Sequence, residues 1–197
     1  MAKIGIKGLT YAPYTSGGEG SAIVYGTGVS LPDYMIRADI SEERSDTDFY
    51  ADDHKIDSDN SMTGATLALE LANMTDDLEK ALLGYVAASN TAGADLNVTD
   101  AAAPFVGVGF IKKERFKGSL TYKGYWFYKV QFTRDTDSVN TKGESVEFQT
   151  ETVNGDAMAV QLEASGANIF YSTCRKTTEA DVRTWLNTKA GISATTT

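Results

Sequence analysis

The stretch most able to do chemistry is DTDFYADDHKIDSD, residues 46–59, which holds six aspartates and the only histidine of the chain, His54. Clustered carboxylates beside an imidazole fit a metal site, a general acid–base site or a charged contact surface. The calcium-binding loop of a helix–loop–helix protein needs a glycine after its third ligand and a glutamate at its end. Counted from Asp57, those places hold Met62 and Ala68, so this calcium pattern is absent.

The same stretch is poorly equipped for zinc or for nucleophilic catalysis. Zinc sites use several cysteines and histidines, whereas this chain has one of each, Cys174 and His54. A serine–histidine–aspartate triad would also have to use His54, and no G-x-S-x-G turn surrounds a serine. Two interpretations of the aspartates stay open, a solvated acidic loop and an irregular cation site. The irregular site would use Asp52, Asp53, Asp57 and Asp59.

Composition limits the classes of function. The chain has 197 residues, which suits one domain, and 18 basic against 27 acidic side chains give a net charge of -9. A chain this acidic is a poor candidate for gripping phosphate backbones by charge neutralisation. No apolar run reaches the length of about 18 residues that a membrane helix needs, and we expect neither a signal peptide nor a membrane span.

Alternation of apolar and polar residues predicts a mainly β protein. In residues 124–133 we expect Trp126 and Tyr128 to enter the core while Tyr125 and Phe127 face outward, away from it. This favours core or interface packing of the four aromatics over base stacking on a nucleic acid. The expected strands are residues 3–11, 22–28, 33–40, 64–71, 105–114, 124–133, 145–151, 157–164 and 167–173.

Two helices interrupt this pattern. Residues 75–84, TDDLEKALLG, begin with a threonine suited to the N-cap and stop at Gly84. Residues 177–191 contain Thr178 and Asp181 at the spacing of a capping box, with aspartate in the glutamate position. Both segments are amphipathic and too short for a helical bundle, so we expect them to flank a sheet.

Long polar segments separate these elements. The expected loops are residues 14–21, 41–62, 87–103 and 134–145. Loops of this length in a single domain are usually functional or become ordered against another chain.

Three stretches together resemble the major tail protein family of long-tailed, non-contractile bacteriophages, the subunits of the tail tube. They are MAKIGIKGLTYAPY at residues 1–14, FYADD at 49–53 and VQFTRDTDSVNTKGESVEFQTETVNG at 130–155. NTKGESVEF and FYADD are the most specific parts. The order of TDDLEKALLG, a polar link and APFVGVGFIKK also agrees, and the resemblance covers roughly residues 1–165.

The resemblance implies a β-sandwich with a flanking helix and a C-terminal helix, in one domain over residues 1–197. Six such subunits would form a ring whose inner sheets join into a barrel, and stacked rings would form a tube that carries double-stranded DNA to the host. The family has no enzymatic activity and needs no cofactor. Its partners are further copies of itself, the tape measure protein, the tail terminator and the distal tail or baseplate proteins. Assembly in the host cytoplasm and residence in the virion tail are implied.

Within this scheme the acidic strand faces are expected to line the tube, because an electronegative channel lets DNA slide. The candidate lumen residues are Asp39, Asp46, Asp48, Glu70, Glu147 and Glu151. The candidate contacts between subunits are Phe49, Tyr50, Asp52, Asp53, His54, Lys142 and Glu144. An N-terminal arm (1–12), the long loop (41–62) and the C-terminal segment (166–197) are expected to reach neighbouring subunits.

Two other classes of protein are also compatible with the sequence. A carbohydrate-binding or cell-surface-binding β-sandwich would use aromatic residues as a sugar platform. The inner-tube protein of a contractile injection system would share the tube architecture.

Overall fold

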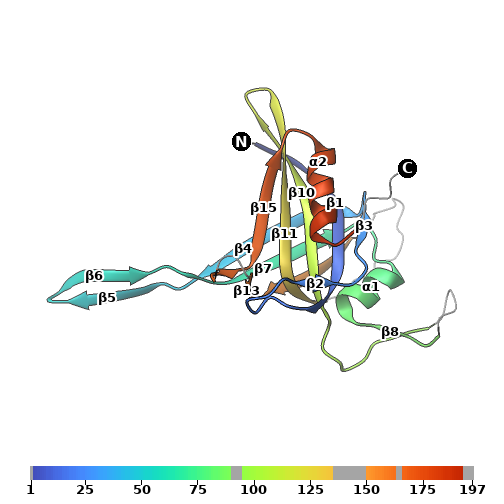
Figure 1. Cartoon of the computed structure of the whole chain (residues 1–197), viewed down its shortest axis with the longest axis horizontal. Helices are drawn as coiled ribbons and strands as arrows, with labels where there is room; N and C mark the ends of the chain where they lie inside the picture. The colour runs from blue at the N-terminus through green and yellow to red at the C-terminus, as the bar shows by residue number, and fades with distance from the viewer. Residues whose placement is uncertain (1, 90–94, 135–149, 163–165, 193–197) are drawn as a thin grey trace, which may run out of the picture.

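The computed structural model describes residues 2–89, 95–134, 150–162 and 166–192, and these form a mainly β protein with two helices (Figure 1). The strands are β1 (Ala2–Ser16), β2 (Val24–Tyr25), β3 (Val29–Leu31), β4 (Met35–Arg44), β5 (Thr47–Ala51), β6 (His54–Asp59), β7 (Met62–Leu71), β8 (Val86–Ala87), β9 (Leu96–Asn97), β10 (Phe105–Phe116), β11 (Ser119–Thr133), β12 (Glu151–Ala157), β13 (Val160–Gln161), β14 (Asn168–Ile169) and β15 (Tyr171–Lys176). The helices are α1 (Asp76–Leu83) and α2 (Glu179–Lys189). The prediction of a mainly β fold is confirmed.

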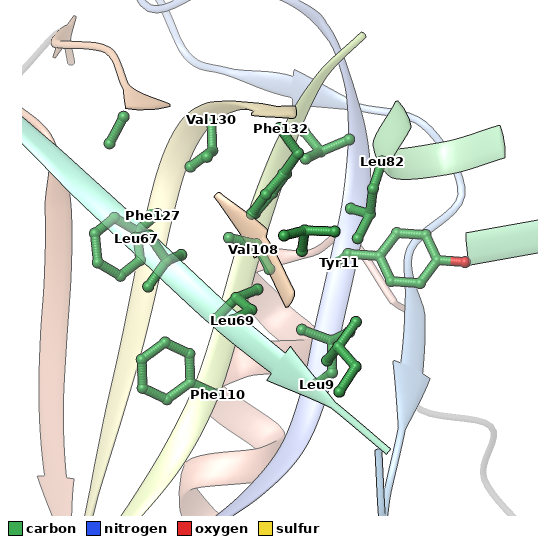
Figure 2. Packing of buried hydrophobic residues seen from close by; sticks show 14 of the residues in the cluster. Leu9, Tyr11, Leu67, Leu69, Leu82, Val108, Phe110, Phe127, Val130 and Phe132 are labelled. Atoms are coloured by element: carbon green, nitrogen blue, oxygen red, sulfur yellow. The ribbon is translucent and has the colours of Figure 1, made fainter. Parts of the chain in front are cut away.

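One large antiparallel sheet dominates the fold. Its strands follow the order β2-β1-β10-β11-β12-β7-β4, with β15 beside β11 and β3 beside β1. Strand β11 is long enough to pair with β15 through its first half and with β12 through its second half. Beyond β12 the sheet turns, so that β7 crosses over β10 and β11 (Figure 2). The described part of the sheet is not closed into a barrel, and β4 stands at one end of it.

The main core lies between β7 and the sheet formed by β1, β10 and β11 (Figure 2). Every second residue of β7 is fully or almost fully buried there, as its alternating sequence predicts. The largest side chains in this core that are completely shielded from solvent are Phe127 and Phe132 from β11. Because they meet leucines from a strand far away in sequence, this core ties the two halves of the chain together.

Strand β11 is buried on both faces, which corrects the expectation of one apolar and one solvated face. Tyr125 and Phe127 pack in the main core, whereas Trp126 and Tyr128 pack in a second core beneath α2. An irregularity in register, at the step from Phe127 to Val130, then returns the apolar positions to the main core. Alternation could not reveal this, because a central strand covered on both sides has apolar residues at every position.

The second core requires a close approach of α2 to the sheet. A Cβ atom on Gly109 would lie 2.6 Å from a methyl carbon of Leu186, and one on Gly124 would lie 2.6 Å from Val182. Glycine at these strand positions lets the helix pack directly on the backbone. Gly109 therefore lies within β10 and serves the packing of α2 on the sheet.

Both expected helices are present, although their ends are stabilised differently. In α2 the backbone N–H of Asp181 donates to the Thr178 hydroxyl at 3.2 Å, which confirms the expected cap. In α1 the N-cap position is Thr75, but its side chain makes no capping bond. Gly84 ends α1 with φ 75°, the left-handed conformation expected of a C-cap glycine. Neither helix is long and apolar enough to cross a membrane.

The N-terminal and C-terminal segments, both expected to reach neighbouring subunits, contribute a strand each to the large sheet. Strand β1 is paired with β10 from Ala2 to Pro13, and its Leu9 is fully buried. The C-terminal segment supplies β15, which pairs with β11, and α2, which covers the second core. Burial of Leu9 and Tyr11 in β1 and of Val182 and Leu186 in α2 attaches both segments to the body, while residues 2–5 of β1 are exposed. The expected strand at 145–151 lies largely outside the described residues.

The expectation of a long loop at residues 41–62 is wrong. Strand β4 runs to Arg44, β7 begins at Met62, and β5 and β6 form an antiparallel hairpin between them. The segment is therefore a continuous two-stranded ribbon. Its polar sequence resembled a loop because almost none of its side chains has a core to enter.

Candidate assembly surface

A projecting hairpin, here called the arm, comprises residues 45–61. Its base is held by the backbone N–H of Ser45, which donates to the carbonyl of Ser61 at 2.8 Å. At its tip Asp52 and Asp53 have φ angles of 49° and 62°. A two-residue turn with both φ values positive matches the twist of a hairpin, and aspartate tolerates that conformation better than most residues. The paired aspartates of FYADD therefore shape a turn.

The arm carries large apolar side chains that contact neither core. Phe49, Tyr50 and Ile56 are 63%, 60% and 60% exposed. Figure 1 shows β5 and β6 extending away from the rest of the sheet. A two-stranded hairpin alone is at best marginally stable in water, and exposed apolar side chains in a cluster mark interaction sites. The arm therefore has the physical character of a docking element.

The carboxylates of the arm are engaged locally. Asp48 forms an ion pair with Lys55 across the hairpin. Asp59 accepts hydrogen bonds from the backbone N–H and the hydroxyl of Ser61, at 2.9 and 3.2 Å, and these bonds lower the pKa of Asp59. Within the described ranges no group of three or more His, Cys, Asp or Glu side chains could hold a metal ion. The irregular cation site considered from the sequence is thus not assembled here.

A second polar surface covers the outward face of β4, β7 and β12. The strand registers pair Asp39 with Ala68 and Arg37 with Glu70, which puts Asp39 and Glu70 on this face. Glu43 and Asp156 occupy the same face by alternation along β4 and β12. This outer face is defined as Arg37, Asp39, Glu43, Glu70 and Asp156. It has four carboxylates against one guanidinium, whose nitrogen lies 2.7 Å from Asp39.

The other candidate lumen residues lie elsewhere. Glu151 pairs in register with the buried Leu71, on the opposite side of the sheet from the outer face. There it accepts from Arg134 at 2.7 Å, and the same guanidinium nitrogen donates to Glu79 of α1 at 2.7 Å. Glu151 therefore helps to fasten α1 to the sheet.

Two more lumen candidates, Asp46 and Asp48, belong to the arm, and Glu147 lies outside the described residues. Glu43 and Asp156 were missed by the sequence reasoning. Their position on the outer face follows from the pairing of β4 and β12 with β7, which the sequence does not reveal.

The candidate contact residues fall into two groups, those on the arm and those outside the described residues. The structure brings five of them together on the arm: Phe49, Tyr50, Asp52, Asp53 and His54. The other two, Lys142 and Glu144, lie outside the described residues. The arm is thus the one place where the structure gathers several of them.

The aromatic run of β11 is unavailable as a binding platform. Tyr125, Trp126, Phe127 and Tyr128 are all buried, with at most 8% of any of them exposed. Stacking of bases or sugar rings needs an open aromatic face. These four residues therefore serve packing.

One sheet edge is open for pairing. Among the described strands, β4 forms hydrogen bonds with β7 alone, which leaves the other side of a ten-residue strand without a strand partner. Exposed edges of this length invite pairing with another chain.

Searches for relatives found no matching protein-family model and no matching curated protein.

Proposed function

We propose that this chain is a structural subunit that assembles with copies of itself, as a tail tube protein of a long-tailed, non-contractile bacteriophage. In this proposal the subunit is a β-sandwich, six subunits form a ring, and rings stack into a tube. The proposal rests on the family resemblance of the sequence together with one structural observation. That observation is the arm, a projecting hairpin that displays Phe49, Tyr50 and Ile56 to solvent.

The arm supports assembly because its large apolar side chains stay exposed to water in a monomer. Its strands are paired with each other, and its large side chains gain nothing from the core. Such a segment contributes stability only when another surface covers it. A copy of the same chain is the simplest partner, since a subunit that repeats in a closed ring presents the same donor and acceptor surfaces at every contact.

The open edge of β4 supports closure of the ring. Pairing of this edge with a strand of an adjacent subunit would join the two subunits and remove the unpaired backbone groups. Because β4 also carries Asp39 and Glu43, the joined sheets would present the outer face repeatedly around the ring. We propose that this face lines the lumen, where its excess of carboxylates would keep DNA from adhering.

The test of assembly is negative-stain electron microscopy of the concentrated protein. Rings or tubes of uniform diameter are expected, whereas a monodisperse monomer at every concentration would overturn the proposal. The matched variant, here called the armless variant, replaces residues 46–60 with Asn-Gly, which forms a two-residue hairpin turn between Ser45 and Ser61. It is expected to fold as a monomer and to form no long tubes.

The test of the lumen uses a reconstruction of those tubes. Asp39, Glu70 and Asp156 are expected to face the channel, with no long Lys or Arg side chain dominating its wall. If the tubes form but the outer face lies on the outside, the lumen assignment is wrong while self-assembly stands.

A further inference from the structure

An open groove lies where the edge of β4 faces the first part of β1. Its volume is about 910 Å³, and its walls include Lys3 and Ile6 of β1 and Ile36 of β4. Phe110 and Tyr125 lie at its floor and continue into the main core. Tyr171 of β15 donates to the Glu42 carboxylate of β4 and so connects these two strands beside the groove. The groove thus combines apolar walls with a polar rim.

Cations gather on the β10–β11–β15 side of this groove. The registers place Lys112 opposite Lys123 and Lys123 opposite Arg175, so three cations line up across neighbouring strands, with Lys112 lining the groove and the other two beside it. Like charges in such cross-strand positions are destabilising unless something compensates them. The compensation within the chain is Glu114, whose side chain is 7% exposed and bonds to Lys112 at 2.9 Å and to Arg175 at 3.0 Å.

One carboxylate does not balance this set. Lys3 pairs in register with Glu114, which brings a fourth cation to the same rim. Lys123 lies over the ring of Tyr125 at 4.6 Å, and Lys112 lies 5.3 Å from its centre. Burial tends to raise the pKa of Tyr125, but hydrogen bonds with these two lysines outweigh it and lower that pKa. The rim therefore carries an excess of positive charge in a chain whose net charge is -9.

The opposite wall is closer to neutral. On β4, Arg37 lies beside Asp39, and Glu42 is occupied by Tyr171 and by Arg44 at 2.7 Å. An anionic guest would therefore be drawn to the β1–β10–β11 side. It would also find apolar surface at Ile6 and Ile36, the latter 44% exposed.

We propose that this groove receives the tip of the arm from a second copy of the chain. The tip has the complementary chemistry, because Asp52, Asp53 and Asp57 supply negative charge while Phe49 and Tyr50 supply exposed apolar surface. Complementary charges fix the register of such a contact and speed its formation. The inference rests on the self-assembly proposed above and names the acceptor for the arm.

The arm of the same chain is badly placed to fill the groove. The arm starts where β4 leaves the groove wall, and Figure 1 shows its tip directed away from the sheet. At the usual rise per residue the tip lies on the order of 25 Å beyond the base of the arm. A paired ribbon cannot fold back sharply without breaking its own hydrogen bonds, so the occupant is another copy.

Two matched charge reversals test the groove. The groove variant carries Lys3→Glu and Lys123→Glu, neither of which bonds to Glu114. The control carries Lys113→Glu and Lys176→Glu, which lie on the opposite face of β10 and β15 and make the same change in net charge. The groove variant is expected to need at least about tenfold more protein for half-assembly in light scattering. The control is expected to assemble like the wild type, and equal assembly of both variants would overturn the inference.

A mixing experiment keeps the inference testable if long tubes never form. The armless variant keeps its groove, and the groove variant keeps its arm. Mixed together, they are expected to form a complex by analytical ultracentrifugation that neither forms alone, and the complex should weaken with salt. No complex in the mixture would overturn the groove as acceptor. Because each variant keeps only one half of the contact, the complex is expected to stop at one copy of each, and the tube itself is tested with the wild-type protein.

If the groove variant fails to fold, as judged by circular dichroism, the arm supplies the test. Asp52→Asn with Asp53→Gly removes two charges and installs a favourable hairpin turn. Weaker assembly of this variant is expected despite its firmer turn. Unchanged assembly would contradict the role of the charged tip.

Discussion

Strands β11 and β5 place aromatic side chains in opposite situations. Phe127 of β11 is fully buried, whereas Phe49 of β5 is 63% exposed. Both residues lie in antiparallel strands with a paired neighbour, so the backbone environment is similar. The difference is the second layer, because β7 covers one face of β11 and α2 covers the other. None of the described residues forms such a layer over the arm.

This contrast separates two uses of the same residue type. In β11 an aromatic ring stabilises the folded subunit by leaving water during folding. In the arm an aromatic ring can leave water only during association. Substitutions in the two regions should therefore change different quantities, namely the free energy of unfolding in one case and assembly in the other.

The largest expected difference is between Phe127→Ala and Phe49→Ala. Phe127→Ala should lower the free energy of unfolding by about 3–5 kcal/mol, since it leaves a cavity in a packed core. Phe49→Ala should change it by less than about 0.5 kcal/mol, as for other exposed sites, while impairing assembly. Urea denaturation of dilute protein measures the free energy of unfolding of both variants. A comparable loss of stability in the two variants would show that Phe49 packs within its own subunit.

A smaller difference is expected between Glu114→Gln and Asp59→Asn. Burial opposes ionisation of Glu114, but Lys112 and Arg175 outweigh it and lower the pKa of that carboxyl. A carboxyl with a lowered folded pKa stabilises the protein above its unfolded pKa of about 4.3, and this contribution is lost as pH falls through the folded pKa. Glu114→Gln should therefore destabilise at pH 7 by about 1–3 kcal/mol, with the penalty shrinking in acid.

Asp59→Asn is the exposed counterpart. Hydrogen bonds from Ser61 lower the pKa of Asp59 as well, but the residue lies in the arm. Because the arm can open without unfolding the body, the Asp59→Asn variant should have the same midpoint of unfolding as the wild type across this pH range. Denaturant unfolding between about pH 3 and 7 distinguishes the two variants. An acid-dependent effect of Asp59→Asn would mean that arm and body unfold together.

The sequence predicted those features that depend on local pattern. The alternation of β7, the Thr178 cap of α2 and the stop of α1 at Gly84 are all present. These signals arise within a few residues of the chain, so no knowledge of distant partners is needed.

Features that depend on long-range pairing were not predicted. The burial of Tyr125 and Phe127 required β7, which precedes them by more than fifty residues. The sequence of the arm predicts a loop because a solvated ribbon lacks the one-sided apolar pattern of a sheet strand. The groove lies between β1 and β4, which are far apart in the order of the large sheet, and no local sequence pattern indicates that these two strands meet.

Amide hydrogen exchange of the arm, followed from dilute to concentrated protein, tests the central account most directly. In dilute subunits the amides of residues 47–59 are expected to exchange rapidly while those of β10 and β11 stay protected. As copies assemble, protection should appear selectively in the arm and along the groove, at Lys3–Ile6 and Ile36–Glu42. Arm protection that is the same at every concentration, with tubes present, would contradict docking of the arm onto another copy.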